Sequence, residues 1–325
     1  MTFITSADRQ RFNEDGYLLV TGLLDPENDL DPLIMEYAEV LEAAAKDLFV
    51  RGKITSLYND LPFGQRAARI IEESDGELHK YFDISLPQKG VTEETPMHCG
   101  PAIFSLLRNE RLLDTVESFL GSKIISNPTQ HVRVKPPATR LDGHPTIIAE
   151  MATTVWHQDQ GTVSPDADET DMLTVWIAVT EATRHNGCLL VAPGSHKRGL
   201  AAHCHDHRAN YSRQAIPEHL VGNRRVALEA RPGDVVFLNK LTMHASLPNL
   251  SDDIRWSLDL RYNPTGQATG RSWFPSFIAR DRAAPENELR DPRIWAELWQ
   301  DARRRLIDNP PTSFQRWSKD DPGCA

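Results

Sequence analysis

The sequence predicts a mainly β protein with flanking helices, built as one domain. From about residue 122 to 265 the chain consists of short apolar runs separated by Pro, Gly and Asn, which is typical of an antiparallel sandwich or barrel. On both sides of this block, apolar residues recur every three or four positions, as they do on helices. The 325 residues contain no internal repeat and no clear linker. We therefore expect one domain over 1–325, with a helical part at about 1–121, a β core at about 122–265 and an extension at about 266–325.

The helices are expected outside the β block. Pro32 suits the first turn of a helix because the missing N–H is not needed there, and Gly121 suits the end of one. The run at 17–24 looks like a strand, whereas 50–100 is mixed and polar. The expected helices are a short one capped by Ser6, one opened by Asp31 and Pro32, one over 105–121 and one over 291–307.

Six runs within the β block are expected to contain strands. They are IISNPTQHVRVKPP, TTVWHQDQG, DMLTVWIAVTEA, GCLLVAPGSH, RRVALEARPGDVVFLN and IRWSLDLRYNP. In the last run, polar Ser257, Asp259 and Arg261 alternate with apolar side chains, so one face of the strand is polar. Such a face suits an interior that contains a site, or a solvated outer surface.

The pair His157 and Asp159 in WHQDQG is the first candidate for chemistry. On a strand, residues two apart face the same side, so the two side chains would point at one place. His244, after the strand-like DVVFLN, can add a second imidazole. Two histidines and one carboxylate form the facial triad of non-haem Fe(II) oxygenases. Zinc accepts the same set, and three unrelated polar residues are the alternative.

Arg255 is a candidate for holding a second molecule beside a metal. It stands eleven residues after His244. A guanidinium offers a carboxylate two parallel hydrogen bonds, which suits the far end of a dicarboxylate co-substrate. An ordinary surface arginine is the alternative interpretation.

Bulk properties exclude several kinds of partner. The net charge of −10 and the pI of about 5.6 argue against nucleic acid and anionic membrane surfaces. We see neither a signal peptide nor an apolar run long enough to span a membrane, and we expect a cytoplasmic protein whose oligomeric state, monomer or homodimer, is open.

The four cysteines form no CxxC, so we expect neither a zinc ribbon nor a disulfide framework. The cluster HCHDH (203–207) offers a second metal site, but an exposed or lid-forming loop is the preferred interpretation.

Taken together, six segments in order resemble the phytanoyl-CoA dioxygenase family, up to about residue 262. They are FNEDGYLLVTGLL, HVRVKPP, WHQDQG, LTVWIAVTEATRHNGCLLVAPGSHKRG, PGDVVFLNKLTMHAS and IRWS. The resemblance implies a double-stranded β-helix (jelly-roll, cupin-like) core. It also implies an enzyme that uses Fe(II), 2-oxoglutarate and O2.

The resemblance also implies roles for individual residues. Asp159 occupies the position at which the related halogenases have a small residue, so hydroxylation is favoured over halogenation. By position in the family's motifs, the iron ligands are His157, Asp159 and His244; the residue that pairs with the distal carboxylate of 2-oxoglutarate is Arg255; and further co-substrate contacts are Trp176, His131 and Ser246.

We expect a dioxygenase that hydroxylates an unactivated C–H bond of a small metabolite or natural-product intermediate, with release of succinate and CO2. Desaturation, epoxidation or ring formation with the same cofactors stay open, and a non-catalytic jelly-roll metal- or ligand-binding protein is the alternative of another class. A coenzyme A thioester is not implied, because the sequence shows no added basic cluster for its phosphates. Residues that can face the interior and contact substrate are Arg133, Lys135, Asp259 and Arg261.

Overall fold

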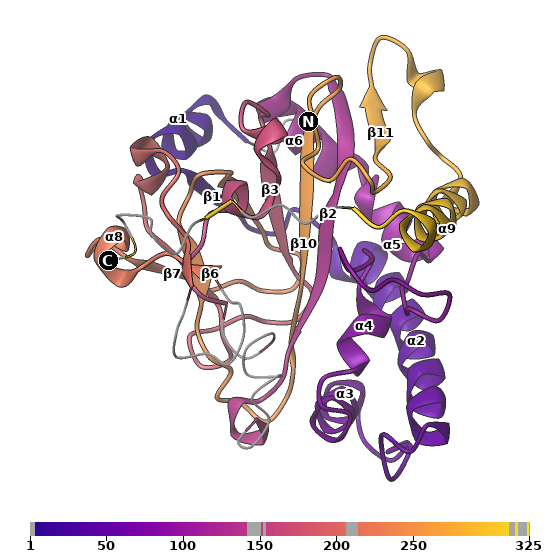
Figure 1. The fold of residues 1–325 in the computed structure, drawn as a ribbon. Helices are drawn as coiled ribbons and strands as arrows, with labels where there is room; N and C mark the ends of the chain where they lie inside the picture. Colours follow the sequence, from indigo (N-terminus) through magenta and orange to yellow (C-terminus); the bar gives the residue numbers. More distant parts are fainter. Residues whose placement is uncertain are drawn as a thin grey trace.

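The fold combines two antiparallel sheets with a layer of helices (Figure 1). The computed structural model describes residues 4–141, 151, 154–205, 214–311, 316–317 and 324. The large sheet has the order β1 (Tyr17–Val20), β8 (Val235–Asn239), β3 (Leu173–Ala178), β10 (Arg255–Pro264), β2 (Lys123–Lys135) and β11 (Phe277–Asp281). A three-stranded sheet has the order β7 (Val226–Leu228), β4 (Leu189–Val191) and β9 (His244–Ser246), and a two-stranded ribbon pairs β5 (Cys204–His205) with β6 (Gln214–Ala215).

The helices cover the face of the large sheet that lies away from the three-stranded sheet (Figure 1). These helices are α2 (Asp31–Val50), α3 (Phe63–Glu73), α4 (Leu78–Phe82), α5 (Pro101–Leu107), α6 (Glu110–Leu120) and α9 (Pro292–Asp308). By contrast, α1 (Ser6–Asp15) lies beside β1, and the short α8 (Glu218–Val221) lies beside β7. A π-helical turn, η1 (Pro26–Leu30), leads into α2.

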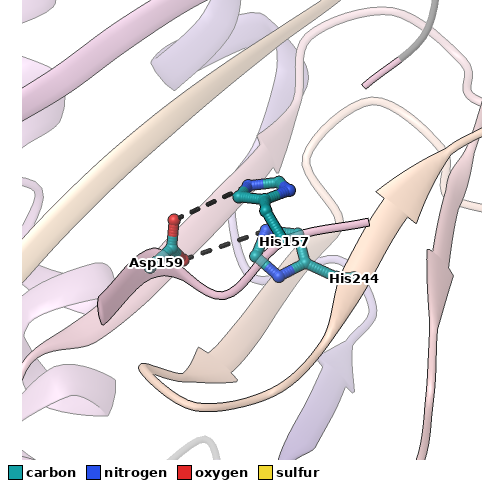
Figure 2. Close-up of side chains that lie close together, drawn as sticks. All are labelled: His157, Asp159 and His244. Atoms are coloured by element: carbon teal, nitrogen blue, oxygen red, sulfur yellow. Dashed lines mark ion pairs between the residues drawn. The ribbon is translucent and has the colours of Figure 1, made fainter. Parts of the chain in front are cut away.

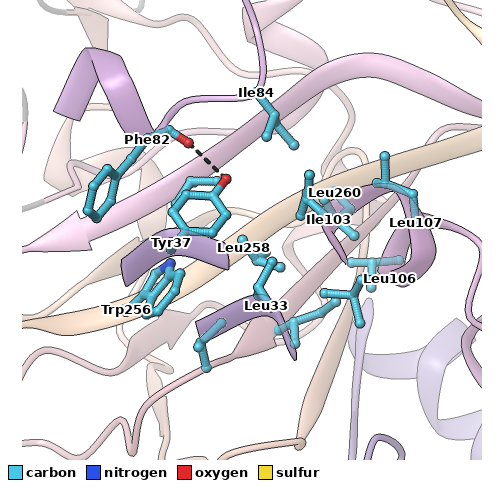
Figure 3. Packing of buried hydrophobic residues seen from close by; sticks show 14 of the residues in the cluster. Leu33, Tyr37, Phe82, Ile84, Ile103, Leu106, Leu107, Trp256, Leu258 and Leu260 are labelled. Carbon is cyan, nitrogen blue, oxygen red and sulfur yellow. Dashed lines mark hydrogen bonds between the residues drawn. The ribbon is translucent and has the colours of Figure 1, made fainter. Parts of the chain in front are cut away.

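The apolar face of β10 is buried against these helices, as Figure 3 shows. Trp256 and Leu258 are almost fully buried, and the Tyr37 ring of α2 lies 5.2 Å from that of Trp256. The Tyr37 hydroxyl donates a 2.9 Å hydrogen bond to the Phe82 carbonyl, so its polar atom is satisfied inside the core. Because side chains alternate along a strand, the other face of β10 is left for the polar residues.

The structure corrects the expectation of a mainly β chain. In the described part of the chain, helices take more residues than strands, and the mixed segment 50–100 contains two of the helices, α3 and α4. The helix expected over 105–121 is two helices, and the chain breaks between them at Arg108 and Asn109. The predicted helices at the N-terminus, from Asp31 and over 291–307 are confirmed as α1, α2 and α9, although the N-cap of α1 is Thr5 rather than Ser6.

The cysteines also depart from expectation. Cys204 and Cys324, which are 120 residues apart in sequence, form a disulfide, whereas Cys99 and Cys188 are free. A disulfide between distant residues leaves no CxxC pattern, so no local motif indicates it. Among the described residues no helix is both long and apolar enough to cross a membrane.

Candidate metal centre

His157 and His244 lie side by side because their backbones pair. The two residues form an isolated antiparallel bridge, with 3.0 Å hydrogen bonds from each amide to the other carbonyl. Their imidazole centroids are 4.1 Å apart (Figure 2). His244 begins β9, so the three-stranded sheet fixes this half of the pair.

Each imidazole is held in the same tautomer. Nδ1 of His157 donates to the Val155 carbonyl at 2.8 Å, and Nδ1 of His244 donates to the Thr242 carbonyl at 2.9 Å. With Nδ1 protonated, Nε2 carries the lone pair that a metal ion binds. Burial lowers the pKa of His157 to about 3, so this ring stays neutral at physiological pH.

Asp159 comes from a turn and not from a strand, which corrects the reasoning from alternation. It begins the 3-10 turn η4 (Asp159–Thr162), two residues after the bridge residue His157. Gln158 points the other way, and its side chain bonds the Gly199 and Leu241 carbonyls and the Ala201 amide. The buried Gln158 therefore anchors the motif and leaves its neighbours facing the pocket.

Two polar side chains hold the Asp159 carboxylate. Arg261 donates to Oδ1, and Thr174 donates to Oδ2 at 2.5 Å. Burial alone would raise the pKa of Asp159, but the charge of Arg261 and the hydrogen bond from Thr174 act in the opposite direction, and the pKa is lowered. The carboxylate is thus ionised, buried and fixed before any metal arrives. Neither Thr174 nor the role of Arg261 had been predicted.

The three side chains can hold one metal ion. His157 Nε2 lies 4.0 Å from Oδ1 of Asp159, and His244 Nε2 lies 3.9 Å from Oδ2 (Figure 2). All candidate ligand atoms lie within 4.8 Å of one another. Two imidazoles and one carboxylate suit Fe(II) or zinc, so the donor set fits the predicted iron.

The triad opens onto a cavity of about 620 Å³, and Arg255 lies in the wall of that cavity. Its side chain is buried, its Nη1 donates to Ser257 Oγ at 2.5 Å, and its guanidinium lies 5.7 Å from the ring centre of Trp176. Nε and Nη2 have no hydrogen-bond partner among the described residues. Burial lowers the pKa of Arg255 to about 10, which still leaves it charged. A buried cation with unused donors is a binding place for an anion.

Lys135 and Ser246 stand at the same end of the cavity. Lys135 is the register partner of Arg255 across β2 and β10, and its ammonium donates to Ser246 Oγ and the Leu247 carbonyl, each at 2.5 Å. Ser246 also accepts from the Thr154 amide at 3.1 Å. This end of the cavity therefore contains two cations, Arg255 and Lys135. For Lys135, the sequence analysis predicted only that it can face the interior and contact substrate.

His131 lies elsewhere in the wall. Its Nδ1 donates to Oδ2 of Asp83 at 3.0 Å, and its residue partner across the sheet is Asp259. Burial lowers the pKa of His131, although the charge of Asp83 opposes the shift. His131 borders the cavity, and its contact with 2-oxoglutarate stays a prediction.

The cluster 203–207 is described only in part, and its first residue is buried. Nδ1 of His203 donates to the Ala201 carbonyl at 2.9 Å, and Nε2 accepts from the Gln158 amide at 2.9 Å. The second metal site finds no support at His203, whose nitrogens are both used, or at Cys204, which is in the disulfide. Asp206 and His207 lie outside the described residues.

The family model for phytanoyl-CoA dioxygenase matches residues 12–257. The chain belongs to the phytanoyl-CoA dioxygenase family. Among curated relatives, a probable phytanoyl-CoA dioxygenase of Caenorhabditis elegans is 25% identical over 80% of this chain and 75% of its own length. A 1-deoxypentalenic acid 11-beta-hydroxylase of Streptomyces arenae is 28% identical over 58% of this chain and 66% of its own length.

A solved structure supports the fold. A non-haem monooxygenase in its apo form (ThoJ) matches with a TM-score of 0.53 and 16% identity, covering 92% of this chain and 98% of that one. Family membership makes the chain an Fe(II)- and 2-oxoglutarate-dependent oxygenase, as predicted, and not a non-catalytic binding protein.

Proposed function

We propose that His157, Asp159 and His244 bind the Fe(II) of this oxygenase, and that Arg255 binds the distal carboxylate of 2-oxoglutarate. The observation that carries the proposal is the presence, in one cavity, of a buried three-ligand cluster and a buried arginine with unused donors. Lys135 adds a second positive charge beside Arg255. Trp176 lies against the Arg255 guanidinium and forms a wall of the same subsite.

When bound, iron with 2-oxoglutarate and O2 supplies an oxidant that removes hydrogen from a C–H bond, with release of succinate and CO2. The residues of the chain supply orientation. Thr174 and Arg261 fix the Asp159 carboxylate, and backbone carbonyls fix the two imidazoles. Three ligands leave coordination positions for co-substrates.

Hydroxylation of a small metabolite or natural-product intermediate is the outcome we propose. The presence of Asp159 supports it over halogenation, and the Streptomyces relative named as a hydroxylase supports it by similarity. Desaturation, epoxidation and ring formation remain the alternative, because they depend on which substrate bond faces the iron. A cavity of about 620 Å³ is of a size for one small molecule.

We further propose that the two facing sheets form a double-stranded β-helix within one domain. In support, β3 and β10 are neighbours in the antiparallel large sheet and bond Asp159 through Thr174 and Arg261, while His244 begins β9 of the three-stranded sheet. One hydrophobic cluster also extends from Ile4 to Leu306. A cytoplasmic location stays a prediction, against which the Cys204–Cys324 bond argues, because disulfides are rare in reducing compartments.

The test needs no substrate. Fe(II) and then 2-oxoglutarate are added to the apoprotein without oxygen, and the visible charge-transfer band of a chelated keto acid is recorded. We expect the band in the wild type, its loss in His157→Ala, and no change in Arg304→Gln, which alters an exposed arginine of α9. Iron binding without the band would overturn the assignment of the site.

A further inference from the structure

His131 lies in the wall between two adjoining cavities. The cavity of about 620 Å³ that contains the candidate metal ligands has a neighbour of about 290 Å³, and His131 and Thr129 line both. The smaller cavity is lined mainly by α4 and the segment that follows it, and none of the three candidate ligands lines it. A molecule bound at the iron centre can therefore extend past His131 into the smaller cavity.

His131 is displaced from the proposed co-substrate subsite. β10 lies between β3 and β2, and Asp259 of β10 is the register partner of Trp176 on one side and of His131 on the other. Since neighbouring strands are about 4.8 Å apart, the backbone of His131 lies roughly 10 Å from that of Trp176. Arg255 precedes Asp259 by four residues, which is about 13 Å along the strand. A 2-oxoglutarate molecule held by Arg255 and Trp176 therefore leaves the space over His131 to a second molecule.

The hydrogen bonds of Asp83 fix the orientation of the His131 ring. Asp83 Oδ2 accepts from His131 Nδ1 at 3.0 Å, while Oδ1 accepts from the backbone amides of Ile84 at 2.9 Å and Val132 at 3.3 Å. With Nδ1 protonated, the lone pair of the neutral ring is on Nε2. Burial lowers the pKa of His131, although the charge of Asp83 opposes the shift, so the ring is neutral at physiological pH. The described part of the chain offers Nε2 no hydrogen-bond partner, and 28% of the side chain is exposed.

Two further acceptors without a donor lie in the same wall. Oδ1 of Asp259, the register partner of His131, and Oγ1 of Thr129 are buried and have no hydrogen-bond partner among the described residues. Both residues border the larger cavity. A buried acceptor that gains no hydrogen bond is destabilising, so these atoms favour a ligand that donates hydrogen bonds.

The cations in this wall decide which kind of donor fits. Arg133 Nε donates to Asp259 Oδ2 at 3.2 Å, and Arg271 Nη2 donates to the Thr162 carbonyl. Both guanidinium groups border the larger cavity, and they would repel an ammonium group. A hydroxyl group donates a hydrogen bond without carrying a charge, so it is the donor that suits this wall.

We propose that His131 accepts a hydrogen bond from a hydroxyl group of the substrate, that Asp83 positions the ring for this contact, and that the substrate is an alcohol extending from the iron centre into the smaller cavity. The proposal rests on the proposed function of the triad and names the substrate class of the same site. 2-Oxoglutarate carries only acceptors, so it has no hydrogen to donate to Nε2. His131 is thus assigned to the substrate, and not to 2-oxoglutarate as its place in the family's motifs had implied.

Matched probes on one ring scaffold test the proposal. The anaerobic Fe(II)·2-oxoglutarate form is titrated with cyclohexanol, methoxycyclohexane, cyclohexanone and cyclohexylamine, and with the corresponding derivatives of decalin. The shift of the charge-transfer band and the shift of the unfolding midpoint both report binding. The ether and the ketone keep an acceptor oxygen but lack the hydroxyl hydrogen, and the amine donates as a cation. We expect the alcohol to bind about tenfold more tightly than the other three, because it alone gives Nε2 an uncharged donor.

Removing the acceptor should remove this preference. His131→Phe keeps an aromatic ring and deletes Nε2, so the alcohol should bind no more tightly than its ether. The affinity for 2-oxoglutarate should stay within about twofold, since its distal carboxylate is held at Arg255. His219→Phe, which makes the same change at an exposed position of α8, should keep the preference.

Asp83→Asn separates positioning of the ring from simple packing. Because Oδ1 accepts from two backbone amides, the asparagine oxygen should stay in that place and its NH2 group should face Nδ1 of His131. The ring then takes the other tautomer, with a hydrogen on Nε2. We expect the ketone and the ether to bind more tightly to Asp83→Asn than to the wild type, so that the preference for the alcohol disappears. A merely structural effect would weaken the binding of all probes alike.

Equal binding of the alcohol and its ether to the wild type, tightest binding of the amine, no binding of any probe, or an unchanged preference in His131→Phe would overturn the proposal. A loss of 2-oxoglutarate affinity in His131→Phe as large as its loss of alcohol affinity would assign the residue to the co-substrate and overturn it as well. If Asp83→Asn fails to fold, His131→Phe still decides. These results differ from a failure of the proposed function, in which no charge-transfer band forms before a probe is added.

Discussion

At the scale of single residues, the candidate ligands are also structural residues. Asp159 is fully buried, and its carboxylate is the acidic partner of the buried Arg261. Arg261 has a second bond, to the Thr129 carbonyl at 2.8 Å. Removing Asp159 therefore takes away a metal ligand and leaves a buried charge without its counter-ion.

Asp159→Ala should accordingly destabilise the apoprotein as well as abolish iron binding. Breaking one side of a buried ion pair costs about 3–5 kcal/mol. Urea unfolding of the apoprotein measures this loss. The double variant Asp159→Ala/Arg261→Met should recover much of it, because the uncompensated charge is gone. If the single variant unfolds at the wild-type urea concentration, the pair does not stabilise the fold.

Arg255→Gln should raise the concentration of 2-oxoglutarate required for the charge-transfer band. Hydrogen bonds to charged groups contribute roughly 1.5–3 kcal/mol each, so the apparent affinity should fall by at least tenfold. The requirement for Fe(II) should stay within about twofold, since Arg255 touches none of the three candidate ligands. A titration of the band at fixed iron measures the change. Equal effects on iron and 2-oxoglutarate would point to a general loss of structure.

At the scale of elements, the alternation of side chains along a strand correctly predicted the polar face of β10. The same rule did not describe how His157 and Asp159 are brought together. The prediction that one face of IRWSLDLRYNP is polar is confirmed, because Ser257, Asp259 and Arg261 border the cavity while Trp256 is in the core. The pair in WHQDQG is brought together differently, by a bridge and a 3-10 turn. Sequence spacing alone cannot distinguish these, since both place two side chains on one side.

The break between α5 and α6 shows a similar limit. The sequence read as one amphipathic helix, but Asn109 begins a new one: its Oδ1 accepts from the Leu112 amide at 3.1 Å. Its Nδ2 donates to Oδ1 of Asp29 at 2.8 Å, which ties the cap to η1. Asparagine is a good N-cap, yet the partner on η1 is 80 residues away and has no local signature.

Asn109→Ala should lower the free energy of unfolding by about 1–2 kcal/mol, because it removes an N-cap and leaves Asp29 without this donor. Asn109→Asp keeps the cap oxygen but places it beside a carboxylate, so it should recover only part of the loss. Chemical denaturation followed by circular dichroism measures both variants. A loss below 0.5 kcal/mol in Asn109→Ala would show that the two helices do not depend on this cap.

At the scale of the whole molecule, the sequence predicted the family, and the family match over residues 12–257 confirms it. Five of the six runs expected to contain strands do so, whereas the described part of TTVWHQDQG forms only the bridge at His157. The assignment of the candidate metal ligands stays a proposal.

The sequence did not predict the tail. Arg316, Trp317 and Cys324 lie beyond the matched region, and each contacts a residue more than 100 positions earlier. Of the three, Arg316 lines the cavity. Contacts of that range depend on the folded sheets and leave no pattern in a single sequence.

The Cys204–Cys324 disulfide can be tested by counting the free thiols of the protein. In denaturant without reductant, a thiol-alkylating reagent should label Cys99 and Cys188 only, and after reduction it should label all four cysteines. Intact mass gives the number of adducts, and a non-reducing peptide map should contain the Cys204–Cys324 pair.

Cys324→Ser is the control, because it frees Cys204 and should give three labelled thiols without reductant. The bond closes a loop of 120 residues, and in the chain-entropy account a loop of that length stabilises the folded state by about 5 kcal/mol. Reduction should therefore lower the unfolding midpoint of the wild type and leave that of Cys324→Ser unchanged. Four adducts without reductant would mean that the tail is held by the contacts of Arg316 and Trp317 alone, and the argument from the disulfide against a reducing compartment would fall with it.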